Sequence, residues 1–302
     1  MSQAGEHPRL WLPVYWPTWA GIGFMWLLDK LPWGEKRLLA RGLGWFAFRV
    51  IRIRRAVVFT NLRLCFPEKT AAEVSALARA HYDSLALGLF ELCAGWWARA
   101  ADLPPHRVVG LRHLQAALAR GHGALLLTAH FTTLEICGRY MSMNHPMGGL
   151  FRDANNPVVA HLMRDQRRRH LSVGVPFEDL RGLVRALRAN HAIWYAPDQG
   201  RRSKSSEILP FFGVPAITNT ATSKIAEMTG AAVVPFFARR EPDHSYTLTL
   251  LPALDNFPGT DAAADAVRIN RLIEEHVRLA PEQYFWVHRR FKARGPGHPE
   301  VY

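Results

Sequence analysis

The sequence predicts an α/β fold, a mostly parallel sheet flanked by helices, preceded by a hydrophobic membrane-anchor helix at the N-terminus. From residue 105 onward, short apolar runs alternate with helical stretches, a pattern typical of parallel strands joined by helices. Before this region, a long uncharged segment is rich in aromatic residues. We therefore expect an anchor at 1–33 and a single α/β domain at 34–302, with a helical part at 34–104 and a core at 105–302.

The segment from Leu10 to Leu28 carries no formal charge for nineteen residues. A helix of that length measures about 28 Å, close to the ~30 Å thickness of the hydrocarbon layer. Pro13 and Pro17 interrupt it, so a full crossing and a tilted or partly inserted helix both stay open. Its tryptophans are typical of a membrane interface, and the basic residues that follow predict that the rest of the chain is cytoplasmic.

The helical part begins with an apolar stripe between Glu35 and Phe48. Further on, Thr70 and Glu73 form a capping-box pattern, which predicts the start of a long helix that runs through Trp97. Apolar residues recur at helical spacing along that whole stretch.

The core is expected to alternate strands with helices. The predicted strands are 108–109, 124–128, 147–151, 173–176, 192–196, 231–237 and an antiparallel one at 245–251. The predicted helices are 111–120, 134–143, 157–169, 180–189, 221–228 and 262–279. In such a sheet, ligands collect at the carboxyl ends of the parallel strands.

His130 follows the predicted strand 124–128, and Glu135 stands five positions further on. Within one helix, positions i and i+5 lie about 140° apart, so the pair can meet only if His130 precedes the helix. We then expect Glu135 to bind the second ring nitrogen of His130, which leaves one nitrogen free to act as a general base. The alternative is a histidine that only caps the helix or satisfies a core hydrogen bond.

Composition restricts the partners. The chain has 302 residues and a net charge of +13, which favours a nucleic acid, an anionic lipid surface or an acidic protein. The three cysteines show no metal-ligand spacing, so no metal site is expected. Signatures of nucleic-acid readers are missing from the sequence, and we expect no nucleic-acid partner. Three basic clusters stand in the core: Arg164, Arg167, Arg168 and Arg169; Arg201, Arg202 and Lys204; Arg289, Arg290, Lys292 and Arg294.

Several strings, in this order along the chain, resemble the late acyltransferases of lipid A biosynthesis, which belong to the lysophospholipid acyltransferase-like superfamily. The strings are Trp16-Pro-Thr-Trp19, Ala129-His-Phe-Thr-Thr-Leu-Glu135, Phe151-Arg152 with Asn156-Pro157, Trp194-Tyr-Ala-Pro-Asp198, and the segment from Ala280 to Lys292. They extend over most of the sequence. Each string is weak alone, but together they are specific.

The resemblance implies an enzyme that takes an acyl chain from acyl carrier protein, without a metal or other cofactor. The acceptor would be a hydroxyl on a 3-hydroxyacyl group of a phosphorylated lipid A precursor, at the cytoplasmic face of the bacterial inner membrane, among its phospholipids. The family motif falls on His130 and Glu135 as catalytic residues. Arg152, Asp198 and Gln199 would bind substrate or the oxyanion, although an Asx-turn role for Asp198 stays open, and family members carry His where Gln199 stands.

A glycerophospholipid or lysophospholipid acyltransferase with the same His/Glu pair is the alternative function. It would share the pair of residues, but we would not expect it to share the other strings. Donor and acceptor panels distinguish the two enzymes.

Overall fold

The computed structural model describes residues 10–200, 202–295 and 297–302. Its helices are α1 (Trp16–Asp29), α2 (Trp33–Phe46), α3 (Arg55–Cys65), α4 (Ala71–Trp97), α5 (Leu111–Leu118), α6 (Leu134–Asn144), α7 (Pro157–His170), α8 (Leu180–Arg188), α9 (Ala221–Thr229) and α10 (Ala262–Leu279). Its strands are β1 (His106–Val109), β2 (Ala124–Leu127), β3 (Gly148–Phe151), β4 (Val173–Pro176), β5 (Ala192–Tyr195), β6 (Ser206–Phe211), β7 (Val214–Asn219), β8 (Ala232–Arg240) and β9 (Tyr246–Leu250). A π-helical turn, η2 (Ala47–Ile51), follows α2, and a short 3₁₀ helix, η4 (Pro281–Gln283), follows α10.

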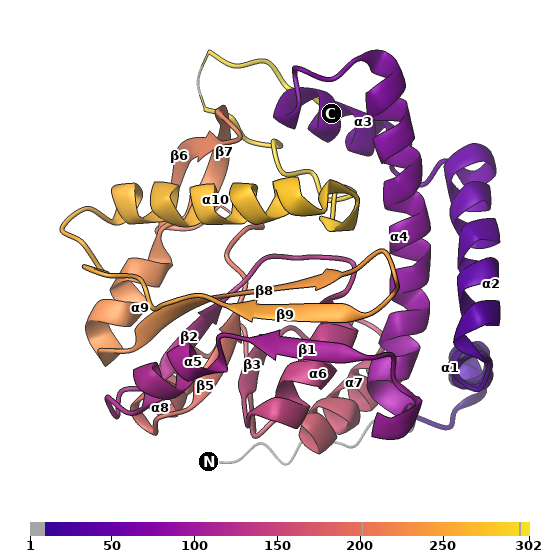
Figure 1. The fold of residues 1–302 in the computed structure, drawn as a ribbon, viewed down its shortest axis with the longest axis horizontal. Helices are drawn as coiled ribbons and strands as arrows, with labels where there is room; N and C mark the ends of the chain where they lie inside the picture. Colours follow the sequence, from indigo (N-terminus) through magenta and orange to yellow (C-terminus); the bar gives the residue numbers. More distant parts are fainter. Residues whose placement is uncertain (1–9, 201, 296) are drawn as a thin grey trace.

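The main sheet has seven strands in the order β1-β9-β8-β2-β5-β3-β4 (Figure 1). Strands β8, β2, β5, β3 and β4 are parallel to one another, whereas β9 is antiparallel to β8 and β1 is parallel to β9. The sheet is therefore mostly parallel, as predicted, and the predicted antiparallel strand is β9. The carboxyl ends of β2, β5 and β3 lie at one edge of this sheet.

Both faces of the sheet are covered, which explains why its central strand β2 is apolar at every position. Side chains alternate between the two faces of a strand. Leu125 and Leu127 pack in the core cluster that also contains residues of α8, α9 and α10. Leu126 packs in a second cluster with residues of α5 and α6.

The helical part stands beside the sheet. The predicted capping box is present: the Thr70 hydroxyl accepts from the Glu73 backbone, and the Glu73 carboxylate accepts from the Thr70 backbone. Helix α4 begins there and runs along the sheet, with α1 and α2 on its outer side (Figure 1).

Helix α2 turns its apolar stripe outward. The buried residues of α2 are small or charged: they are Lys36, Ala40 and Gly44, and a Cβ on Gly44 would meet the carbonyl oxygen of Tyr82 in α4 at 2.9 Å. Leu38 and Trp45 are exposed. The helix therefore packs closely through its small residues and leaves its large apolar ones uncovered.

Among the described residues, no helix is both long and apolar enough to cross a membrane. The first α-helix, α1, is 14 residues long and ends at Asp29. The expected membrane-spanning helix is therefore not observed in this part of the chain, and residues 1–9 of the expected anchor lie outside the described residues.

Candidate active site

Strands β2 and β5 bring His130 and Asp198 together. The two strands are adjacent and parallel, with Leu127 opposite Tyr195, and the Thr128 amide donates to the Tyr195 carbonyl at 2.9 Å. His130 and Asp198 each stand three positions beyond this pair (127 to 130, 195 to 198). Because both residues lie the same number of positions beyond a paired position, both side chains lie at the carboxyl edge of the sheet. Ligand sites are expected at this edge in this type of fold.

Asp198 holds the imidazole of His130. Its Oδ1 lies 2.6 Å from Nδ1 of the ring, and its Oδ2 accepts from the His130 backbone amide at 3.1 Å and from the Tyr284 hydroxyl at 3.1 Å. The Asp198 side chain is 1% exposed, whereas that of His130 is 33% exposed. With Nδ1 bound to a buried carboxylate, the other ring nitrogen, Nε2, is the one left for a substrate.

The two partners stabilise each other's charged forms. Burial disfavours the imidazolium, but the charge and hydrogen bond of Asp198 outweigh burial, and the pKa of His130 is raised above its ordinary value. Burial likewise opposes ionisation of Asp198, but His130 and Tyr284 outweigh it, so the pKa of Asp198 is lowered. The pair is therefore suited to a general base that becomes positively charged during a reaction and is then stabilised by the carboxylate.

The prediction that Glu135 binds the second ring nitrogen of His130 is wrong, because Asp198 occupies that nitrogen. Glu135 is the second residue of α6, and its Oε2 accepts from Nε1 of Trp96 on α4 at 3.2 Å. It still lines the same pocket as His130. The prediction of a catalytic role for Glu135 therefore stays open, but the orienting contact belongs to Asp198.

A segment late in the chain fixes the loop that carries His130. The Phe285 amide donates to the His130 carbonyl at 3.1 Å, and the Thr132 amide donates to the Gln283 carbonyl at 2.8 Å. Phe131 and Tyr284 form an antiparallel bridge between these contacts. Because the same segment supplies the Tyr284 hydroxyl to Asp198, it holds both members of the pair.

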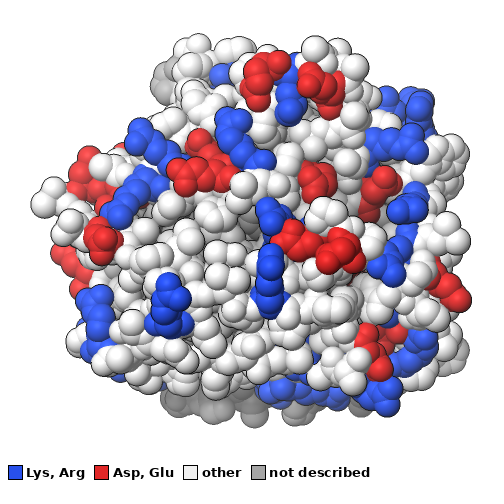
Figure 2. All heavy atoms as spheres, in the orientation of Figure 1, with Lys and Arg blue, Asp and Glu red and all other residues white. Residues whose placement is uncertain are grey.

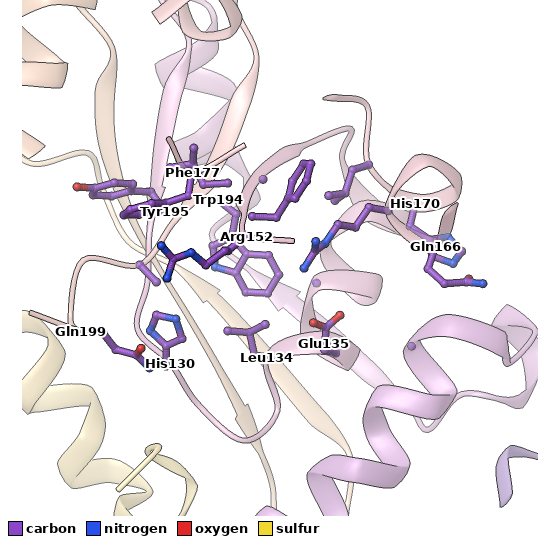
Figure 3. Close-up of a pocket in the computed structure, with 18 of the residues that line it drawn as sticks. His130, Leu134, Glu135, Arg152, Gln166, His170, Phe177, Trp194, Tyr195 and Gln199 are labelled. Atoms are coloured by element: carbon purple, nitrogen blue, oxygen red, sulfur yellow. The ribbon is translucent and has the colours of Figure 1, made fainter. Parts of the chain in front are cut away.

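His130 opens into a pocket of about 670 Å³. Four of the five predicted site residues, His130, Glu135, Arg152 and Gln199, line it, while Asp198 lies behind His130. Figure 3 shows His130 and Gln199 on one side of the pocket and His170 and Gln166 on the opposite side, with Glu135 and Trp194 between them. The structure therefore brings all five predicted residues to one place.

Arg152 reaches the pocket from the end of β3. Its Nη2 lies 3.2 Å from Oε1 of Glu178, and both side chains are more than half exposed. Such a solvated pair contributes little stability and leaves the guanidinium free to exchange partners.

Sequence reasoning missed the basic side of the pocket. Arg139, Arg167, His170, His288 and Lys292 also line it. Burial, followed by nearby cations, lowers the pKa of His288 to about 4, so this histidine is neutral near pH 7. Arg167 and Lys292 were visible as members of basic clusters, but nothing in the local sequence separates them from their exposed neighbours.

The clusters themselves do not form one surface. Arg290 is buried and donates to the Ile217 carbonyl at 2.5 Å and to Thr218 Oγ1 at 3.1 Å, so its role is structural. Arg201 lies outside the described residues. On the face seen in Figure 2, acidic and basic side chains are intermixed, so the positive excess is not concentrated there.

In the described ranges, no group of three or more His, Cys, Asp or Glu side chains is arranged to hold a metal ion. The three cysteines are free and buried. The described lining of the pocket that holds His130 includes none of them.

Comparison with known proteins identifies the family. A family model described as bacterial lipid A biosynthesis acyltransferase matches residues 3–293. The lipid A biosynthesis lauroyltransferase of Escherichia coli (strain K12) is 38% identical over 304 residues, covering 100% of this chain and 98% of the relative. The palmitoleoyltransferase of the same strain is 34% identical, covering 98% and 96%, and the myristoyltransferase is 27% identical, covering 98% and 92%.

Among solved structures, the 1-acyl-sn-glycerophosphate acyltransferase PlsC from Thermotoga maritima is similar, with a TM-score of 0.38 and 13% identity, over 81% of this chain and 97% of that chain. This likeness is too distant to bear on function. The family model matches residues 3–293, and two relatives are more than 30% identical over nearly the whole chain. The chain therefore belongs to the bacterial lipid A biosynthesis acyltransferase family.

Proposed function

We propose that the protein transfers a fatty acyl chain from acyl carrier protein to the hydroxyl of a 3-hydroxyacyl group on a lipid A precursor. The observation that carries the proposal is the His130–Asp198 pair at the edge of a parallel sheet, open to a pocket of about 670 Å³. The named relatives, which are acyltransferases of lipid A biosynthesis, support the substrate class.

In the proposed reaction, Nε2 of His130 removes the proton of the acceptor hydroxyl as its oxygen attacks the thioester carbonyl. A free alcohol is hardly ionised near neutral pH, so this proton transfer is the step that needs a base. Asp198 holds the ring by Nδ1 and stabilises the imidazolium that forms. When the carbon–sulfur bond breaks, the imidazolium returns its proton to the thiolate, and an ester and a free thiol result.

The negative charge that develops on the carbonyl oxygen needs stabilisation. Arg152 and the amides at the start of α6 are the candidate donors, because both border the pocket near His130. Gln199, on the same side as His130 in Figure 3, is the candidate for positioning the acceptor. A thioester already has a good leaving group, so the proposed reaction requires no metal or other cofactor.

We further propose that the protein works at the cytoplasmic face of the bacterial inner membrane, in contact with its phospholipids. Exposed large apolar side chains are concentrated in α1, α2 and η2: Trp16, Phe24, Trp26, Leu27, Leu38, Leu39, Leu43, Trp45, Phe46, Val50 and Ile51. The exposed basic residues Arg41, Arg49 and Arg52 accompany them. Apolar and aromatic side chains accompanied by arginine are typical of a surface that lies in a lipid interface.

The activity is tested with purified full-length protein, acyl carrier protein thioesters and a lipid A precursor in mixed micelles, with the product measured by mass spectrometry. We expect acyl transfer to the precursor, and its loss in His130→Ala with the fold retained. His122→Ala, which removes an exposed histidine outside the pocket, is the matched control. Near-normal turnover in His130→Ala would remove His130 as the base, and transfer to lysophospholipid but not to the precursor would favour the alternative function.

Membrane contact is tested by co-sedimentation with vesicles that contain anionic phospholipid. The double variant Leu43→Ser/Trp45→Ser should bind the vesicles more weakly, because it removes two exposed apolar side chains of α2. Leu279→Ser is the matched control, since Leu279 is exposed at the end of α10. Equal binding of all three proteins would show that this surface does not contact lipid.

A further inference from the structure

The pocket has a second polar wall that the proposed proton transfer does not use. It is formed by Arg139 from α6 and by Arg167 and His170 from α7, and it extends to Trp194 from β5, which lies between His170 and His130 in Figure 3. Three buried nitrogen atoms of these residues can only donate and have no hydrogen-bond partner among the described residues: Nε of Arg139, Nη1 of Arg167 and Nε1 of Trp194. Nε2 of His170 and Oε1 of Gln166, which also lines the pocket, are unpartnered as well, and the imidazole nitrogen donates or accepts according to its tautomer. We call these four residues the donor wall.

Unpartnered donors of this kind are uncommon in a folded protein. A buried polar group without a partner costs roughly 1–3 kcal/mol, more when it is charged. Once turned toward the cavity, the three obligate donors would be satisfied by a ligand that supplies several acceptors at once.

Cationic side chains also outnumber acidic ones in the described lining of the pocket. Arg139, Arg167 and Lys292 face it as cations without a salt bridge among the described residues, whereas Arg152 is paired with Glu178. Glu135 is the only acidic side chain that lines the pocket in the described part of the chain. Burial lowers the pKa of both Arg139 and Arg167, which means that their positive charges are poorly solvated where they stand.

The geometry of the arginines favours a particular anion. The Arg167 guanidinium lies over the Phe151 ring, with Cζ 4.7 Å from the ring centroid, and both residues line the pocket. Planar guanidinium groups match phosphate oxygens with paired hydrogen bonds. A phosphate monoester offers three free oxygens and up to two charges, more than the two oxygens and one charge of a carboxylate. A phosphodiester also carries only two free oxygens and one charge, so it would satisfy fewer of the donors.

We propose that the donor wall is a subsite for a phosphoryl group carried by one of the two substrates. This inference rests on the proposed function, because it assigns part of the substrate of that reaction. Figure 3 shows His170 on the side of the pocket opposite His130. The phosphoryl group therefore binds away from the reacting atoms and aligns the substrate along the pocket, so that its loss weakens binding more than it slows the bound reaction.

Two sources share this chemistry: a phosphate monoester on the sugar of the acceptor, and the phosphodiester of the pantetheine arm on the acyl carrier protein. Steady-state kinetics with Arg139→Gln separates them. We expect kcat/KM to fall about tenfold to hundredfold with both phosphates present, mainly through KM, as for the loss of charge-assisted hydrogen bonds. Arg181→Gln, an exposed arginine on α8 outside the pocket, is the matched control and should behave as the unaltered protein.

Substrates that lack one phosphate at a time show which substrate supplies the phosphoryl group. If the acceptor supplies it, Arg139→Gln and the unaltered protein should have nearly equal kcat/KM on a dephosphorylated acceptor. If the donor supplies it, they should become equal on an S-acyl pantetheine donor without phosphate. A defect of the same size on every substrate combination would overturn the proposal, because the arginine would then not be coupled to a phosphate.

A binding measurement keeps this inference separate from the proposed reaction. At constant ionic strength, inorganic phosphate should raise the Tm of the unaltered protein and of Arg181→Gln, but not that of Arg139→Gln or Arg167→Gln. Two variants are used so that poor folding of one does not decide the result. Absence of acyl transfer together with this Tm shift would refute the proposed function alone, whereas no phosphate-dependent shift in any protein would refute the subsite.

Discussion

Replacing Asp198 by asparagine is the sharpest test of how His130 is held. The amide has the size of the carboxylate but only one acceptor oxygen. In the native protein both oxygens accept: Oδ1 from Nδ1 of His130, and Oδ2 from the His130 backbone amide and the Tyr284 hydroxyl. A backbone N–H cannot reverse its role, so the amide oxygen of the substituted side chain is expected at the position that Oδ2 occupies in the native protein.

The amide nitrogen then faces the imidazole. It donates to Nδ1, which forces the ring proton onto Nε2 and removes the free nitrogen that accepts the hydroxyl proton. A wrong tautomer of this kind costs about 10⁴-fold in kcat in a His/Asp pair, equivalent to about 5.5 kcal/mol in the barrier. We expect a loss of that order in Asp198→Asn, measured as kcat at saturating donor and acceptor.

Tyr284→Phe is the matched control. It removes one hydrogen bond to the same carboxylate but leaves the imidazole tautomer unchanged, so kcat should fall no more than about tenfold. Nitrogen chemical shifts of the His130 ring report the tautomer directly. If Asp198→Asn retains more than about a tenth of the native kcat, the reasoning that Asp198 fixes the base is refuted.

Three further outcomes are expected. Glu135→Gln should lower kcat less than Asp198→Asn does, by under about 10²-fold. It should leave the acidic limb of the pH profile in place, because Glu135 contacts Trp96 rather than the imidazole ring. A displaced limb would restore Glu135 as the partner of His130. In the native protein, kcat/KM should be high at alkaline pH and fall as the pH drops through a pKa above 6.5. The reason is that Asp198 raises the pKa of His130 and that only the neutral ring is a base. An acidic limb well below pH 6.5 would contradict this assignment. Thr70→Ala should lower the free energy of unfolding by about 0.5–2 kcal/mol through loss of the capping box, measured in urea, and an unchanged midpoint would show that the box is not formed.

Much of the fold follows from local pattern. Helix α10 was predicted with the bounds that the structure shows, Ala262–Leu279, because its apolar residues recur at helical spacing over many turns. The hairpin of β6 and β7 was missed. Pro210 and Pro215 oppose each other within it, and its turn places Phe212 at a φ of 51°, a conformation that bulky residues rarely adopt.

The site shows where local reasoning stops. His130 and Asp198 were each recognised at a strand end, but their contact depends on β2 lying next to β5, and 68 positions separate the two residues along the chain. The order of strands in a sheet is a tertiary property that no short window contains. Glu135 was chosen as the partner because it is near in sequence, and the helix that begins at Leu134 directs it to Trp96 instead.

The clamp on the His130 loop by residues 283–285 has a consequence for biosynthesis. A ribosome-bound chain that has not yet released this segment already contains His130 and Asp198, but it lacks the bonds that fix their loop and the hydroxyl that binds the carboxylate. The loop and the carboxylate can therefore be held as they are in the folded protein only after residues 283–285 have been synthesised and have docked against them.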